Sequence, residues 1–305
     1  MFGPSPNVLF RLGALKKSAV IENDDWYRLV APMFLHAGIV HYVLDMIALF
    51  YLGGGVERRH GTPETIIVFL LTAIGGNIAS TLFMSQPLSV GAAGGIFGLL
   101  GVCLSDFAMN WDLLTLKNHR DVLDPAHKGF PFGVAIFWLS TVIFINAILG
   151  LTPYIDQFAH IAGFFFGIGF GIPFLRWLKG PGFFGPISPG KHLLCGLGRF
   201  CLFTVTMSVF FILAFLLLKS DGDPLCDVCR HISCVPFPFG TNETWWQCDD
   251  CDLAEGIIVQ DSPSTVVEFS CPGSAETVQI DLMEEKVDPA LIQESWGNYC
   301  RQYCH

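Results

Sequence analysis

The chain has 305 residues, of which 52% are hydrophobic and only 14% are charged, and its mean hydropathy is +0.51. A soluble domain usually carries about 25% charged residues, so this composition indicates a protein whose main solvent is lipid. The formal net charge of −10 excludes the basic surface that nucleic-acid binding requires. We expect no nucleic-acid partner, no cofactor and no metal.

Six apolar runs approach the ~20 residues that cross a bilayer as a helix. Glycine, proline and polar residues interrupt several of them, which is typical of spans packed in a bundle. The sequence therefore predicts an all-α polytopic membrane body. The runs are Met33–Gly54, Thr65–Met84, Ser89–Phe107, Phe132–Leu151, Ile155–Leu175 and Phe200–Leu218.

Charge divides the chain into a membrane body and an acidic tail. Up to Lys219 there are 14 Lys and Arg against 11 Asp and Glu, whereas from Ser220 onward there are 3 against 16. Met1–Asp25 is a mixed, loop-like stretch without the apolar core of a signal peptide, and residues 1–32 are expected to form an extracytoplasmic first-loop segment. We expect three parts: residues 1–32, a transmembrane domain over 33–219, and a separate Cys-rich domain over 220–305.

Basic residues follow the first, third and fifth runs, and the positive-inside bias makes that side cytoplasmic. Six spans then place both termini outside, with the tail in a lumen or the extracellular space. The protein would belong to the secretory pathway or the plasma membrane. The basic residues are Arg58, Arg59, Lys117, Arg120, Lys128, Arg176, Lys179, Lys191 and Arg199.

Four ionisable residues in the predicted spans point to a site in the outer half of the membrane. His36, His41 and Asp45 lie in the first run, and His160 lies in the fifth. His41 and Asp45 are four residues apart and share one helix face. Such residues are costly in lipid, so they indicate either a functional site or hydrogen-bonded packing near the interface.

Small residues recur at every fourth position of two runs, which lets helix backbones approach closely. Gly163 and Gly167 follow His160 in the fifth run, and the third run contains Gly91 and then Gly94 and Gly98, which are four residues apart. The two glycine ridges predict a close helix pair that places a short side chain opposite the His160 imidazole.

In five ordered blocks, covering residues 3 to about 219, the chain resembles the rhomboid family of intramembrane serine proteases. The family's rhomboid-like helical bundle is therefore the expected fold. The blocks are Gly3-Pro4-Ser5 with Trp26-Tyr27-Arg28; His36-Ala37-Gly38-Ile39-Val40-His41-Tyr42-Val43-Leu44-Asp45; Tyr51 to Gly61; Gly91-Ala92-Ala93-Gly94; and Ala159-His160-Ile161-Ala162-Gly163 through Gly167.

The resemblance implies a Ser–His dyad that cleaves transmembrane substrates. His160 would be the general base, and His41 and Asp45 would lie on the oxyanion side. Ala93, however, occupies the nucleophile position, where a methyl group cannot attack a carbonyl carbon. Ser80, Ser85 and Ser89 are poor substitutes by position.

Asp45 is a second departure, because the family has an Asn there that donates a hydrogen bond to the oxyanion. An ionised Asp cannot donate, although a protonated one could. A third departure is the absence of the span that normally precedes the Gly-Pro-Ser loop, which we interpret as truncation.

These departures favour a catalytically inactive homologue, a pseudoprotease that binds transmembrane clients in the lipid bilayer. The alternative is an intramembrane serine endopeptidase seen with its serine substituted. A transporter or channel would need internal repeats or a charged pathway, and the sequence has neither.

Eight cysteines lie in the tail, and their even number favours disulfides in an oxidising compartment. The spacing Cys226-x2-Cys229-x18-Cys248-x2-Cys251 also fits a zinc ribbon. The sequon at Asn242 predicts a glycoprotein and agrees with disulfides. Alternating residues near Thr265 and Thr277 predict strands in a small β-containing domain. The cysteines are Cys226, Cys229, Cys234, Cys248, Cys251, Cys271, Cys300 and Cys304.

Overall fold

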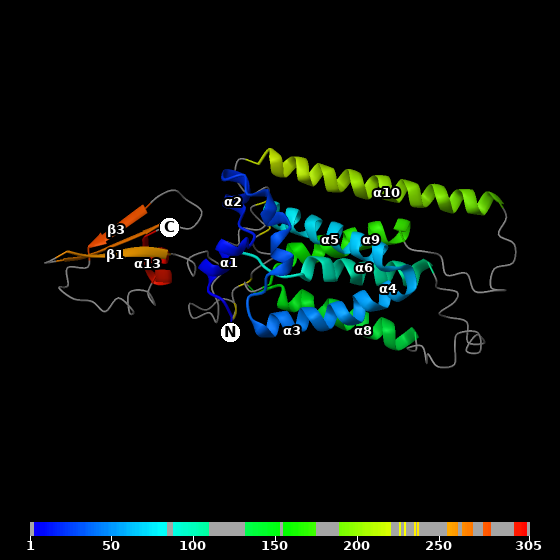
Figure 1. The fold of residues 1–305 in the computed structure, drawn as a ribbon, viewed down its shortest axis with the longest axis horizontal. Helices are drawn as coiled ribbons and strands as arrows, with labels where there is room; N and C mark the ends of the chain where they lie inside the picture. Colours follow the sequence, from blue (N-terminus) through cyan, green and yellow to red (C-terminus); the bar gives the residue numbers. More distant parts are fainter. Residues whose placement is uncertain are drawn as a thin grey trace.

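The computed structural model shows a bundle of apolar helices with a small sheet at one end (Figure 1). Two predicted runs, Phe132–Leu151 and Ile155–Leu175, match the observed helices Phe132–Leu149 and Gln157–Phe174 to within two residues at each end. The ends of the other four runs are shifted further. Within the residues that the structure describes, four helices are long and apolar enough to cross a membrane, and two shorter apolar helices accompany them. The described residues are 3–83, 88–109, 132–152, 155–174, 189–220, 226, 229, 235, 237, 255–261, 264–270, 277–281 and 296–303.

The N-terminal segment is helical rather than loop-like. It contains α1 (Pro6–Leu12), α2 (Lys17–Glu22) and two 3-10 turns, η1 (Trp26–Leu29) and η2 (Ala31–Phe34). A helix of six or seven residues is marginal alone, so tertiary contacts must hold these turns together, and sequence periodicity does not reveal them.

Arg28, from the Trp26-Tyr27-Arg28 motif of the first resemblance block, supplies those contacts. Its buried guanidinium donates hydrogen bonds to the carbonyl oxygens of Phe10 and Ala14 and pairs with Asp25 at 2.8 Å. Trp26 packs beside the buried cluster that includes Leu15. The motif therefore ties the N-terminal segment into one unit.

The first span begins later than predicted. It is continuous from Ile39 to His60 and comprises α3 (Ile39–Ala48), a π-helical turn η3 (Leu49–Gly53) and α4 (Gly54–His60). Extended backbone at Gly38 separates it from η2. His36 consequently lies in the preceding loop and not in the span, which corrects the prediction from the apolar run.

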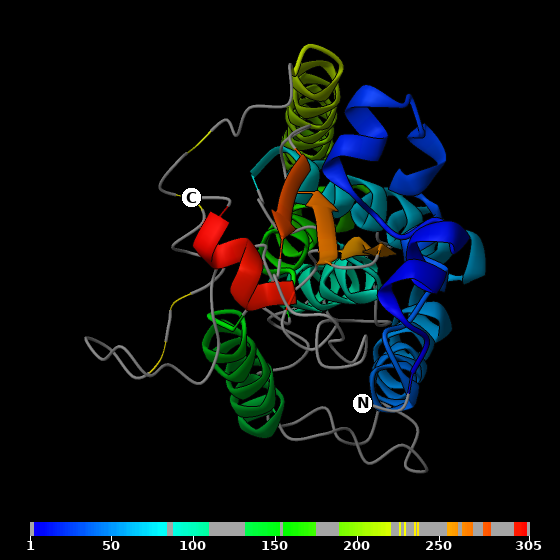
Figure 2. The same ribbon diagram turned by 90° about the vertical axis from the view of Figure 1, so that its left-hand side faces the viewer.

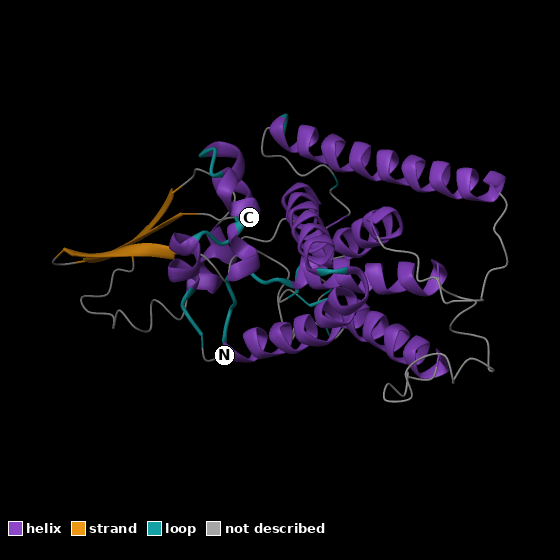
Figure 3. Ribbon diagram, turned by 45° about the vertical axis from the view of Figure 1, so that its right-hand side comes forward, coloured by secondary structure: helices purple, strands orange, loops and turns teal. Residues whose placement is uncertain are grey.

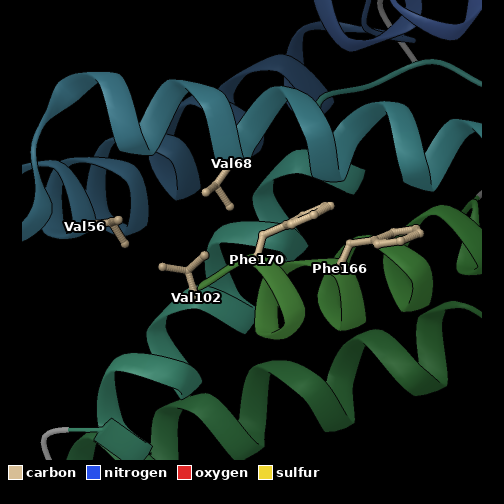
Figure 4. Packing of buried hydrophobic residues seen from close by; sticks show 5 residues of the cluster. All are labelled: Val56, Val68, Val102, Phe166 and Phe170. Carbon is tan, nitrogen blue, oxygen red and sulfur yellow. The ribbon is translucent and has the colours of Figure 1, made fainter. Parts of the chain in front are cut away.

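Three helices form the centre of the bundle: α5 (Thr62–Phe83), α6 (Ala93–Met109) and α9 (Gln157–Phe174). A Cβ atom at Gly163 would collide with the carbonyl oxygen of Gly94, and one at Gly167 with that of Gly98. The predicted pairing of the two glycine ridges is therefore confirmed, but the α6 residue that stacks on His160 is Phe97 and not a short side chain, which corrects that part of the prediction. Figure 4 shows the buried residues packed between these helices and α4, which are Val56, Val68, Val102, Phe166 and Phe170.

The two remaining apolar helices lie at the periphery. The long helix α10 (Pro189–Leu218) runs along the outside of the bundle (Figure 3), and Arg199 donates a hydrogen bond to the carbonyl oxygen of Pro173 near the end of α9. Helix α8 (Phe132–Leu149) lies on the opposite side of the bundle from α10 (Figures 1 and 2). This arrangement leaves α3 and α8 on the same side.

The tail contains an antiparallel sheet in the order β1 (Glu255–Asp261), β2 (Ser264–Ser270) and β3 (Thr277–Asp281), followed by α13 (Trp296–Tyr303). Val267 and Ile280 are paired across β2 and β3 and are both buried. The predicted strands are confirmed. The sheet lies at the same end of the molecule as α1 and α2 (Figures 1 and 2).

Cys226 and Cys229 are joined by a disulfide, and Cys300 is also disulfide-bonded. A thiol in a disulfide cannot serve as a zinc ligand, so this pair agrees with the disulfide prediction rather than with a zinc ribbon. Outside the described residues lie Asn242, Cys234, Cys248, Cys251, Cys271 and Cys304.

Candidate functional site

A buried carboxylate with three nitrogen atoms nearby lies in the N-terminal part of the first span. Asp45 Oδ2 accepts a hydrogen bond from the backbone N–H of Ala92 at 3.1 Å. His36 Nε2 lies 3.3 Å from the same oxygen, and His41 Nε2 lies 3.4 Å from it. We call His36, His41, Asp45 and the Ala92 N–H the Asp45 cage. It joins two residues of α3 to the start of α6.

Local backbone structure brings the two histidines to this carboxylate. His41 and Asp45 are one helical turn apart on α3, as predicted. His36 reaches the same oxygen from the loop before α3, where Gly3 lies so close to Ala37 that a Cβ would collide with its carbonyl oxygen. Burial lowers the pKa of His36, and the neighbouring Asp45 carboxyl opposes this shift.

Gly91 closes the cage from the side of α6. Its N–H donates to the carbonyl oxygen of Pro32, and its φ of +131° is strained for any residue with a side chain. A Cβ there would also lie 2.8 Å from the His41 ring. The glycine is therefore required both by the backbone and by the close approach of the imidazole.

Ala93 and His160 lie on the two helices that pack most closely. Ala93 is the first residue of α6, directly after the residue that binds Asp45. His160 is buried on α9 and stacks on Phe97 of α6, with ring centroids 4.2 Å apart and an interplanar angle of 11°. Its Nδ1 finds no hydrogen-bond partner among the described residues. The imidazole is thus held in place by stacking on Phe97.

The neighbouring serines Ser80 and Ser89 are hydrogen-bonded to Asp156. Both hydroxyls donate to Asp156 Oδ2, at 2.5 and 2.8 Å, while Asp156 Oδ1 accepts from the N–H of Ala159. These three contacts join α5, the loop before α6 and the start of α9. Ser85 lies outside the described residues.

Two buried acids in the predicted spans were missed from sequence. Asp156 precedes α9 and accepts a hydrogen bond three residues on, the signature of an N-cap, which the sequence signal for a helix start could have indicated. Asp106 pairs with Arg59 at 2.5 Å and lies 3.4 Å from the buried His60. From the sequence alone, Arg59 serves only as a marker of orientation.

The fold and the site define a class of protein: a polytopic helical membrane protein with clustered imidazoles beside a glycine-rich helix start. A family model described as the Rhomboid domain matches residues 23–177. The chain belongs to the rhomboid family.

Three relatives show the range of this similarity. RHOMBOID-like protein 4 of Arabidopsis thaliana is 31% identical over 82% of this chain, which spans 59% of that protein. RHOMBOID-like protein 1 of the same plant is 27% identical over 99% of this chain and 74% of its own length. Inactive RHOMBOID-like protein 8 is 29% identical over 82% of this chain and 69% of its own length. The relatives thus include proteins whose names mark them as inactive and proteins whose names do not.

Proposed function

We propose that this chain is a rhomboid pseudoprotease, which binds the transmembrane helices of client proteins without cleaving them. The observation that carries the proposal is Ala93, a methyl side chain at the position that the family resemblance gives to the nucleophile. A methyl group can neither lose a proton to His160 nor attack a carbonyl carbon. The site therefore lacks the atom that begins acyl transfer.

The bundle around this position is nevertheless well packed, which supports a retained binding role. The glycine contacts between α6 and α9 leave no room for a larger residue, and the Asp156 hydrogen bonds join three elements beside Ala93. A decayed site under no constraint would not be expected to keep such close contacts.

In this proposal the client helix reaches the site between α3 and α8. Both helices lie on the side of the bundle opposite α10 (Figures 1 and 2), and the structure ties α8 to its described neighbours far less closely than it ties α5, α6 and α9 to one another. The exposed face of α3 is apolar and includes Val43, Leu44 and Ile47. An apolar helix in the bilayer matches that surface chemically, and the Asp45 cage lies at its outer end.

The alternative function is that of an intramembrane serine endopeptidase seen with its serine substituted. The stacking of His160 on Phe97 favours it, because the general base keeps a fixed orientation that a pseudoprotease would not require. The codon for position 93 in the source gene separates the two functions. A serine codon there would favour the protease.

Site-specific photo-crosslinking in liposomes tests client binding. A photoreactive residue at Ile47 on α3 is compared with one at Phe211 on α10; these side chains are 50% and 64% exposed. The probe is a single-span test protein with an apolar transmembrane helix. We expect several-fold more crosslinked, full-length probe at Ile47 than at Phe211. Equal crosslinking at the two positions would mean that the probe meets the chain only by collision in the bilayer.

A further inference from the structure

One oxygen of the Asp45 carboxylate, Oδ2, accepts a hydrogen bond from the Ala92 N–H and lies within 3.4 Å of two imidazole nitrogens. We propose that this carboxylate is an internal anion, which occupies the oxyanion position and blocks catalysis independently of Ala93. This proposal rests on the proposed function and deepens it, because it predicts that restoring the serine alone does not restore cleavage.

The geometry of the cage is the first support. A backbone N–H and two imidazole nitrogens lie between 3.1 and 3.4 Å from one carboxylate oxygen, Asp45 Oδ2. Hydrogen-bond donors fixed in a buried setting stabilise an oxyanion during acyl transfer. The Ala92 N–H is such a donor to Asp45 Oδ2, and His36 Nε2 lies close to the same oxygen without a hydrogen bond to it. Here the position that faces the donor is already filled, by an oxygen that belongs to the protein.

The difference between Asp and Asn at position 45 is the second support. An Asn oxygen would still accept the hydrogen bond from the Ala92 N–H, and its amide N–H groups would remain free to donate to a substrate. A carboxylate keeps the contact with Ala92 but offers only acceptors. The substitution thus preserves the local fold but gives the substrate a negatively charged acceptor in place of hydrogen-bond donors.

In an A93S variant, the negative charge of Asp45 would act on the first step of the reaction. The introduced hydroxyl oxygen bonds to the substrate carbonyl carbon, its proton passes to His160, and the carbonyl electron pair moves onto the oxygen. The proton then passes from His160 to the leaving amine as the peptide bond breaks, and water hydrolyses the resulting ester. The oxyanion of the first step would form against the Asp45 carboxylate, and like charges at close range oppose it.

The test compares four full-length forms in liposomes: the chain as written, A93S, D45N, and A93S with D45N. Cleavage of a single-span test protein is measured, together with labelling by a fluorophosphonate, which needs an activated serine but no client helix. Losing one oxyanion donor typically costs roughly 10²–10³ in kcat. We therefore expect the double variant to cleave and to label at least about 100-fold faster than A93S, and D45N alone to remain inactive.

The matched control is A93S with D24N. Asp24 is exposed, and its φ of 58° suits Asn as well as Asp, so this change removes a carboxylate without touching the cage. It should leave A93S as slow as before. Equal rates for A93S and the double variant would overturn the proposal, and so would a folded double variant that neither cleaves nor labels. Client binding is tested separately, by crosslinking of the chain as written, and does not depend on the outcome of this comparison.

Discussion

Gly91 shows how the site depends on a single missing side chain. Its positive φ excludes alanine, and so does the His41 ring, which would lie 2.8 Å from an added Cβ. Strain of this kind costs about 1–3 kcal/mol. We expect Gly91→Ala to lower the free energy of unfolding by about that amount, measured by denaturation in detergent micelles.

Gly54→Ala is the control for Gly91→Ala. A Cβ at Gly54 meets nothing within 4 Å, and the residue lies in a helical backbone. Alanine there should be neutral or stabilising by up to about 1 kcal/mol, since it lowers the entropy of the unfolded chain. Equal losses of unfolding free energy at the two positions would contradict the positive φ and the close approach of His41 at Gly91.

At this scale the sequence identifies the members of the site but not their partners. The i, i+4 spacing correctly places His41 and Asp45 on one face, yet nothing in the sequence shows that the Ala92 N–H meets Asp45. That contact depends on how α3 and α6 approach each other. For the same reason the apolar run extends the first span through His36, which the structure places in a loop.

At the scale of elements, Asp156 joins α5, the loop before α6 and α9. Removing its carboxylate takes away an acceptor shared by two serine hydroxyls and the Ala159 N–H. Loss of an N-cap costs about 1 kcal/mol and an unsatisfied buried group about 1–3 kcal/mol. We expect Asp156→Ala to destabilise the bundle by at least about 2 kcal/mol in the same denaturation assay.

A double-mutant cycle checks that this loss comes from the three-way contact. Asp156→Ala and Ser89→Ala should be coupled by about 0.5–3 kcal/mol, because each removes the other's partner. Ser105→Ala is the matched control, since Ser105 donates to the carbonyl oxygens of Gly101 and Ile168 instead. Simple additivity of Asp156→Ala with Ser89→Ala would contradict the contact.

The helix pairing was predictable because glycines at four-residue spacing have few other uses in a membrane helix, and Gly163 and Gly94 do meet. The helices of the N-terminal segment were not predictable in the same way. They are short and mixed in composition, and the buried Arg28 that holds them together makes long-range contacts.

At the scale of the whole molecule, the proposed topology can be tested with the free thiols. Cys195 is exposed at one end of the candidate span Cys195–Leu218, and Cys103 is half-buried in α6. The positive-inside prediction places Cys195 on the cytoplasmic side and Asn242 in the lumen. In sealed microsomes we expect an impermeant maleimide to label Cys195 but not Cys103, and Asn242→Gln to remove a glycan. A protected Cys195 together with an unglycosylated Asn242 would reverse the orientation.

The central claim is that the chain as written binds a transmembrane helix and does not cut it. The most direct measurement incubates the chain and its His160→Ala variant with the single-span test protein in liposomes and follows the product with time. We predict no product above the rate without the chain, for either form. Product from the chain as written that disappears with His160→Ala would contradict the claim, because it would require a nucleophile other than the residue at position 93.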